Sequence, residues 1–344
     1  MRTTITLVHK NCSHNCSFCA YGKSDPVGYG EVQNAVETLM RQGYRVHLYD
    51  FDVGPESLSV YRLTRQFEGC NPGWLNVLPE FDPSPEDLDY INHLRTAIAI
   101  SLHGSTPEVH RRASGKNNWG DIVAFIRRYP ERYRLPLGIN YVVSRRNLDD
   151  MAPMIELCLQ FKLEFLEFIP MGYSGNAVAR MGPDAILSSE EKHRAWRTVA
   201  DHRDSVPFEI EMDAIWGPDF DNDAAAACRF FASPVSGTYC NAGINHFAIR
   251  LNDRKVFPCP CMAGIDELAI GEFDNDELKI GENWLQDSDR FAEPCASCDR
   301  FSSCRGGCRL TAISDYCIAH GTYDRYAGFD DCLFRLTRQH DSDE

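Results

Sequence analysis

Three cysteines near the N-terminus constrain this chain more than any other feature of its sequence. Cys12, Cys16 and Cys19 lie within eight residues, directly after the apolar, β-branched run Thr4–Val8. Thiolates spaced this closely on one loop can hold a soft metal centre from one side, and three protein ligands leave a fourth position open. The alternative is structural zinc, which needs four ligands and usually has paired C-x2-C spacing. The spacing therefore favours a metal centre with an open position.

The pattern C-x3-C-x2-C, with Phe18 before its third cysteine, resembles the signature of radical S-adenosylmethionine (SAM) enzymes. In that family the three cysteines hold a [4Fe–4S] cluster whose fourth iron is chelated by SAM. One electron cleaves SAM to a 5′-deoxyadenosyl radical, which abstracts a hydrogen atom from the substrate. The resemblance implies that Cys12, Cys16 and Cys19 are cluster ligands and that Phe18 lies beside the cofactor. It also implies an electron donor of the flavodoxin or ferredoxin type.

Length and composition are those of an ordinary globular protein of about two domains. The chain has 344 residues, of which 43% are hydrophobic and 25% charged. We find neither a signal peptide nor the ~20 apolar residues of a membrane span, so we expect a cytoplasmic protein. Fifteen cysteines in such a chain favour metal or redox use over disulfides. The net charge of −15 argues against nucleic acid as the main partner. It would suit a cationic substrate, and solubility is the simpler alternative explanation.

Strand-like and helix-like runs alternate over the first half of the chain. We expect strands at 4–9, 45–51, 74–79, 97–103, 137–143 and 164–169, with helices at 31–42, 56–65, 83–94, 107–113, 120–128 and 148–161. This order predicts a parallel βα array whose ligands bind at the carboxyl ends of the strands. The radical SAM resemblance implies a partial (βα)6, TIM-like barrel. We expect this core at 1–175, a connecting segment at 176–239 and a cysteine-rich domain at 240–344.

Further SAM contacts are implied by the resemblance after later strands. The family usually has a Gly-Gly-Glu-Pro-like turn after strand two, where this chain carries Asp52 and Glu56 in a different order. Either of these acids, or Asp50, is a candidate replacement. Ser101 and Asn140 match positions that often contact the SAM ribose or carboxylate. Their alternative roles are a strand-end hydroxyl and a buried, hydrogen-bonded amide.

A second group of cysteines fills the last third of the chain. The ordered series ending in C-x2-C-x5-C-x3-C…C resembles the SPASM domain, a C-terminal extension of radical SAM enzymes with two auxiliary [4Fe–4S] clusters; paired zinc ribbons are the alternative. The resemblance assigns cluster I to Cys240, Cys259 and Cys308, and cluster II to Cys295, Cys298, Cys304 and Cys332.

Some positions depart from the SPASM pattern. Arg254 stands where a glycine is expected, and His246 stands where some relatives have a fourth ligand of cluster I. Cys261 is the nearest replacement ligand; without it, cluster I would have an open iron that could hold substrate. Cys317 is left over as a candidate hydrogen-atom donor or alternative ligand.

These features predict a redox enzyme that begins with hydrogen-atom abstraction. Most SPASM relatives oxidise or crosslink ribosomally made peptides during natural-product maturation, whereas a smaller group oxidises or epimerises aminocyclitols and sugars. Many peptide-modifying members have a leader-binding domain before strand one, so a first strand at residue 4 keeps the sugar alternative open. A non-catalytic iron–sulfur electron carrier is the third alternative. Asp213, at the end of a strand-like run, is our candidate general base.

Overall fold

The structure is a computed structural model of the chain. It describes residues 3–9, 12, 14–21, 27–50, 58, 62, 70–71, 75–94, 96–212, 216, 242–281, 283–286, 290–293, 295–298, 301 and 307–328.

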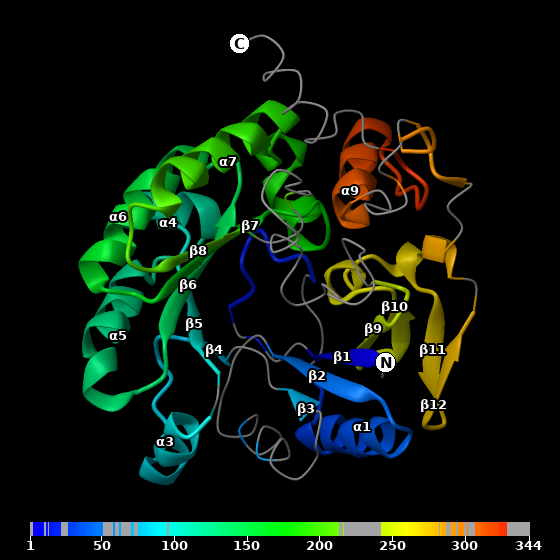
Figure 1. Ribbon diagram of the computed structural model, residues 1–344, viewed down its shortest axis with the longest axis horizontal. Coiled ribbons are helices and arrows are strands. Elements are labelled where there is room, and N and C mark those ends of the chain that lie inside the picture. The colour runs from blue at the N-terminus through cyan, green and yellow to red at the C-terminus, as the bar shows by residue number, and fades with distance from the viewer. Residues whose placement is uncertain are drawn as a thin grey trace.

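Two β-sheets form the frame of the molecule (Figure 1). One has the order β4-β5-β6-β7-β8 and is parallel throughout. The other has the order β12-β11-β10-β9-β1-β2-β3; it is parallel from β9 to β3 and antiparallel from β9 to β12. The strands span Thr4–His9 (β1), Arg45–Asp50 (β2), Cys70–Asn71 (β3), Leu75–Val77 (β4), Ile98–Ser101 (β5), Leu137–Val143 (β6), Phe165–Pro170 (β7), Glu209–Met212 (β8), His246–Arg250 (β9), Lys255–Phe257 (β10), Gly271–Asp274 (β11) and Glu277–Ile280 (β12).

Most helices cover the outer side of this frame, whereas α9 (Arg309–His320) lies apart from them, above β10 in the view of Figure 1. The others described are α1 (Tyr29–Arg41), α3 (Pro85–Asn92), α4 (Pro107–Ser114), α5 (Trp119–Arg132), α6 (Met151–Phe161) and α7 (Ser189–Arg203). Local chemistry sets several ends: the side chains of Ser84 and Thr106 accept backbone hydrogen bonds at the starts of α3 and α4. Helix α4 ends at Gly115, whose φ of 75° suits glycine.

This architecture confirms the predicted partial TIM-like barrel. The six expected strands correspond to β1, β2, β4, β5, β6 and β7, while the helix expected at 56–65 falls almost wholly outside the described residues. Two parallel strands from later in the chain extend the array: β8 pairs with β7, and β9 pairs with β1. The cysteine-rich part of the chain therefore shares a sheet with the barrel.

The two faces of the five-stranded sheet differ in polarity. One row of registered neighbours is apolar and buried on all five strands: Val77, Ile100, Ile139, Leu166 and Ile210. Burying side chains of this size contributes roughly 1.5–3 kcal/mol each. The row one residue further along points to the opposite face and is polar, with Ser101, Asn140, Glu167 and Glu211 in register. At this level of the sheet, one face is therefore apolar and the other is polar.

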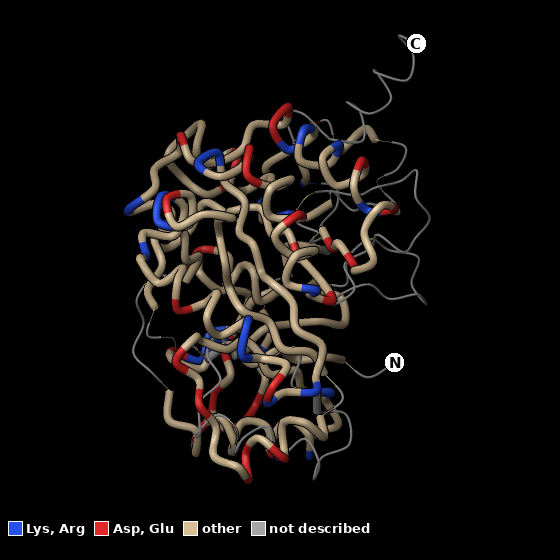
Figure 2. Tube along the Cα trace, turned by 90° about the vertical axis from the view of Figure 1, so that its left-hand side faces the viewer, with Lys and Arg blue, Asp and Glu red and all other residues tan. Residues whose placement is uncertain are grey.

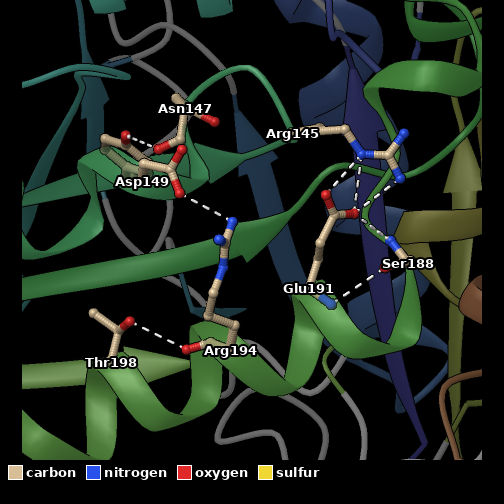
Figure 3. A network of polar contacts seen from close by, with 8 residues as sticks. Arg145, Asn147, Asp149, Ser188, Glu191, Arg194 and Thr198 are labelled. Carbon is tan, nitrogen blue, oxygen red and sulfur yellow. Dashed lines mark hydrogen bonds and ion pairs between the residues drawn. The ribbon is translucent and has the colours of Figure 1, made fainter.

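Helix α7 is joined to the segment after β6 by a polar network (Figure 3). Ser188 and Glu191 form a capping box at the start of the helix, and Glu191 also accepts hydrogen bonds from Arg145 at 2.8–3.0 Å. One turn further, Arg194 pairs with Asp149 at 3.0 Å. These contacts are largely exposed, and water screens exposed ion pairs. They therefore contribute little to the stability of the protein, and their main effect is to orient the helix.

The surface carries both signs of charge. Acidic and basic residues are interspersed along the trace in Figure 2, with the acidic excess that the composition requires. Within the described part of the chain, no helix is long and apolar enough to cross a membrane.

Two histidines flank Thr6 of β1 in the register of the sheet: His47 on β2, and His246 on β9, which is buried. A hydrogen bond of 2.7 Å links Thr6 Oγ1 to His246 Nε2, and Thr6 Oγ1 also lies 3.4 Å from His47 Nδ1. Burial lowers the pKa of His47 to about 4 and that of His246 to about 3, the latter helped by His47. Both rings are therefore neutral near pH 7.

We expect the free energy of unfolding to fall as the pH drops below about 6.5. Below this pH the two histidines are protonated in the unfolded chain but stay neutral in the folded protein. The free energy of unfolding therefore falls by about 1.4 kcal/mol per pH unit for each histidine, until the pH reaches the pKa of that histidine in the folded protein. In His246→Gln, the loss between pH 6.5 and 5 measured by urea denaturation should be shallower by roughly 2 kcal/mol. The exposed His93 on α3 supplies the control, His93→Gln, which should keep the wild-type slope. Equal slopes for both variants would contradict this prediction.

Candidate functional site

The loop with Cys12, Cys16 and Cys19 leaves β1 at its carboxyl end, where ligands of parallel arrays bind. All three cysteines are thiols and are partly exposed. The Cys19 N–H donates to the Cys16 carbonyl at 3.2 Å, which closes a turn between two of the thiols. Asn15 has a left-handed φ of 45°, a conformation that asparagine tolerates better than most residues. The predicted ligand residues thus lie together on one folded loop.

Asn176, in the segment that follows β7, holds this loop. Its side-chain Nδ2 donates to Asn15 Oδ1 and to the Cys16 carbonyl, both at 2.8 Å, and its backbone N–H donates to the Cys19 carbonyl at 2.8 Å. Asn176 is 7% exposed, so water competes little for these bonds. A net contribution of about 1 kcal/mol for each bond is typical.

Ala20 is enclosed by two other segments. Ser174 Oγ donates to the Ala20 carbonyl at 3.1 Å. A Cβ atom on Gly175 would lie 2.4 Å from that oxygen, and one on Gly264 would lie 2.2 Å from it. Gly175 also has a positive φ of 55°. Both glycines allow a backbone approach that any larger residue would prevent.

Phe18 meets a histidine at the end of the β5 segment. The rings of Phe18 and His103 are edge to face, with centroids 4.5 Å apart. His103 Nδ1 accepts from the Val142 N–H at 3.0 Å, and burial, with further lowering by His110 and His14, holds the pKa of His103 well below its usual value. The ring is therefore neutral, with its proton on Nε2. The sequence analysis missed this residue, whose one signal is its place two residues after Ser101.

Ser101 and Asn140 are brought side by side in the register of β5 and β6. Asn140 Nδ2 donates to Asn76 Oδ1 at 3.0 Å, whereas the buried Asn140 Oδ1 accepts no hydrogen bond from the residues that the structure describes. A buried acceptor without a donor is costly, and a ligand hydroxyl or ammonium group would satisfy it. Asp52 and Glu56 lie outside the described residues, as does Asp213.

The cysteines of the predicted auxiliary sites are described in part. Cys259 precedes a short 3-10 helix, Pro260–Met262, which contains Cys261; Cys308 is the N-cap of α9; and the Cys298 N–H donates to the Cys295 carbonyl at 3.2 Å. Cys240, Cys304 and Cys332 lie outside the described residues. In the ranges that are described, no three His, Cys, Asp or Glu side chains are grouped so as to hold a single metal ion. In a [4Fe–4S] cluster, each thiolate binds a different iron.

Two further residues of this region have defined surroundings. His246 uses Nε2 to join Thr6 within the barrel sheet. Cys317 is buried in α9 beside Tyr323, and burial raises the pKa of its thiol.

The first cysteine loop contacts this second cysteine region directly. Tyr21 donates its hydroxyl hydrogen to the Pro260 carbonyl at 2.6 Å, between Cys259 and Cys261. The segment after β7 also contacts α9: the Tyr173 N–H donates to Ser314 Oγ at 3.4 Å. The two cysteine groups are therefore parts of one packed assembly.

Solved structures of other proteins have the same fold as this chain. The chain superposes on SuiB of Streptococcus suis bound to S-adenosylmethionine with a TM-score of 0.67 and 12% identity, covering 96% of this chain and 77% of that one. For anSMEcpe with bound AdoMet the TM-score is 0.66 at 14% identity, covering 98% and 95%. SuiB has also been solved with precursor peptide SuiA, and anSMEcpe with the Cp18Cys peptide. This chain therefore shares the fold of these two proteins, and it carries a three-thiol loop after β1.

Sequence similarity points to one group of relatives. The chain is 29% identical over 225 residues to a PqqA peptide cyclase of Ruegeria pomeroyi, and 24% identical over 230 residues to one of Rhizobium meliloti. Each match covers 63% of this chain and 56% of the relative, so the chain spans about half the length of the curated relatives it matches. No protein-family model matches the chain.

We expect Gly264→Ala to loosen the cysteine loop. The new Cβ would lie 2.2 Å from the Ala20 carbonyl oxygen, so the backbone must shift, at a cost of roughly 1–3 kcal/mol in unfolding free energy. Hydrogen exchange of residues 14–21, followed by mass spectrometry, should become faster. Gly120→Ala is the matched control, because nothing lies within 4 Å of that site in α5. Unchanged exchange in Gly264→Ala would refute the close approach.

Proposed function

We propose that this chain is a radical SAM enzyme that begins by removing a hydrogen atom from a ribosomally made peptide, and then oxidises or crosslinks it during natural-product maturation in the cytoplasm. The observation that carries the proposal is the three-thiol loop, held at the carboxyl ends of the barrel strands in a chain similar to PqqA peptide cyclases. Solved structures of the same fold contain precursor or substrate-like peptides, which supports the peptide class.

The residues at this site fit the cofactors that the class uses. Cys12, Cys16 and Cys19 would hold the cluster, because the loop is already folded and its thiols are accessible. When bound, a [4Fe–4S] cluster with SAM supplies the electron and the radical chemistry. Asn140 Oδ1 would accept a hydrogen bond from SAM beside Ser101, and Phe18 would supply an apolar contact. The polar face of the sheet would thus bind the cofactor.

The cysteine-rich part of the chain would hold two auxiliary [4Fe–4S] clusters as a SPASM domain. Cys240, Cys259 and Cys308, with Cys261 as the candidate fourth ligand, would bind one; Cys295, Cys298, Cys304 and Cys332 would bind the other. The contact from Tyr21 to the Cys259–Cys261 segment would keep these sites near the first loop. A flavodoxin or ferredoxin would supply electrons, and Asp213 would act as general base.

The deciding experiment incubates reduced, reconstituted protein with SAM and candidate substrates. A peptide encoded beside the gene should raise 5′-deoxyadenosine release and change mass, by loss of hydrogen for an oxidation or crosslink. Turnover of an aminocyclitol, but no peptide, would favour a sugar dehydrogenase or epimerase. An iron–sulfur protein that releases no 5′-deoxyadenosine under any condition would be an electron carrier and would refute the proposal.

Replacing Cys12, Cys16 and Cys19 together with alanine should abolish 5′-deoxyadenosine release. The fold should remain, because this loop lies at the barrel mouth and contributes little to the apolar core. Circular dichroism and product analysis measure the two effects. Cys158→Ala, which changes a fully buried thiol on α6, is the control that should retain SAM cleavage. SAM cleavage by the triple variant would show that these three cysteines are not the cluster ligands.

Iron and sulfide analysis should give three clusters, about twelve irons, per chain. Three groups of cysteines at this spacing require that content if all are cluster sites. Cys295→Ala should lose about four irons and much of its solubility, because a cluster ligand there would hold the second region together. About four irons in the wild-type protein, or stoichiometric zinc, would refute the SPASM assignment while leaving the first site intact.

A further inference from the structure

The segment after β7 donates hydrogen bonds to four carbonyl groups of the first cysteine loop. We call Ser174, Asn176 and Arg180 the carbonyl clamp. Its bonds run from Arg180 Nη1 to Asn15 O (3.1 Å), from Asn176 Nδ2 to Cys16 O (2.8 Å), from the Asn176 N–H to Cys19 O (2.8 Å) and from Ser174 Oγ to Ala20 O (3.1 Å). All four carbonyls therefore point toward one short segment, although they belong to two separate parts of the loop.

The directions of these carbonyl groups also fix the directions of the N–H groups in the loop. In a planar trans peptide, the N–H of one residue points opposite to the carbonyl of the residue before it. The N–H groups of Cys16, Ser17, Ala20 and Tyr21 are therefore directed away from the carbonyl clamp. One bond checks this geometry: the Ser17 N–H donates to the Ser114 carbonyl, at the end of α4, at 3.1 Å.

One N–H group of this loop already faces a thiol: the His14 N–H donates to Cys12 Sγ at 3.4 Å. Peptide directions in the loop therefore matter to a metal–thiolate site. Hydrogen bonds to cluster or cysteine sulfur stabilise the more negative, reduced state and so raise the reduction potential. A loop free to turn its peptides would present carbonyl oxygens to the sulfur atoms instead, with the opposite effect.

We infer that Asn176 is a positioning residue for the first cluster: it fixes the peptide directions of the cysteine loop, and thereby presets the loop for its cluster and raises the cluster potential. That a cluster binds here rests on the proposed function. That Asn176 fixes the conformation of the loop rests on the hydrogen bonds alone. Asn176 is the central member because it alone makes three of the bonds to the loop, on both sides of the Cys16–Cys19 turn.

The choice of asparagine has a chemical reason. The Asn176 amide supplies two N–H donors to two acceptors, Asn15 Oδ1 and Cys16 O. Aspartate has nearly the same shape but only acceptor oxygens, so Asn176→Asp would place three acceptors against one another in a buried place. The backbone N–H bond to Cys19 would remain in that variant. The substitution therefore tests the side chain alone.

The test compares Asn176→Asp with a matched variant, Asn92→Asp. The Asn92 amide also joins two backbone groups, Arg132 O and the Arg134 N–H, but lies on α3 away from the cysteine loop. In the metal-free protein, the alkylation rates of Cys12, Cys16 and Cys19 are followed by mass spectrometry. In the reconstituted protein, the potential of the SAM-binding cluster is measured by redox titration with electron paramagnetic resonance.

We expect Asn176→Asp to speed alkylation of these thiols by about tenfold or more, because a lost buried hydrogen bond raises the open population by that order. Its first cluster should have a lower potential, while the auxiliary clusters keep theirs. Asn92→Asp should change neither quantity. If Asn176→Asp fails to fold, Arg180→Ala, which removes an exposed bond, should show the same changes in smaller degree.

Two results would overturn the inference. Wild-type alkylation rates in Asn176→Asp would show that the loop is not preset by this side chain. Faster alkylation in Asn176→Asp with an unchanged cluster potential would show that Asn176 does not influence the potential of the cluster. A wild-type protein that assembles no first cluster would contradict the proposed function instead, and the metal-free alkylation would still decide whether Asn176 presets the loop.

Discussion

Backbone pairing on both sides of β1 is the interaction on which the rest of the structure depends. Residue 4 is in register with Arg45 on β2 and with His246 on β9. This double pairing fixes the strand from which the cysteine loop emerges, and it draws the cysteine-rich part of the chain into the barrel sheet. The Thr6–His246 hydrogen bond adds a side-chain contact to the same junction. The position of the first site therefore follows from contacts between the two ends of the sequence.

The polarity of the five-stranded sheet explains why a site can form beside this junction. Its apolar row, with Ile100, Ile139 and Leu166 almost wholly buried, stabilises the packing of the outer layer. The opposite row can then carry Asn140 and its unsatisfied oxygen without loss of the core. The apolar row thus contributes to stability, while the acceptor oxygen of Asn140 lies on the opposite face of the same strands.

Much of this arrangement follows from local sequence patterns, and the rest depends on distant contacts. Strands β1 and β6 begin and end where alternation and apolar runs place them, and the cysteine loop lies at the predicted sheet edge. The pairing of β9 with β1 was not predicted, because nothing in Phe247–Ile249 specifies a partner strand so far away. Asn176 and His103 were missed as site residues for the same reason. An asparagine after a strand, or a histidine at a strand end, has a local pattern no different from that of many surface residues.

The pairing of β1 with β9 has a consequence for the order of events during synthesis. The ribosome makes the cysteine loop long before β9, a neighbour of β1, which begins at residue 246. Until then, one edge of β1 has no neighbour, and the Pro260 carbonyl that receives the Tyr21 hydroxyl does not yet exist. The loop can therefore reach its final form only after residue 260 has been synthesised. A ligand of this loop that arrived earlier would meet an unfinished site, so the fold itself sets the earliest moment at which binding is possible.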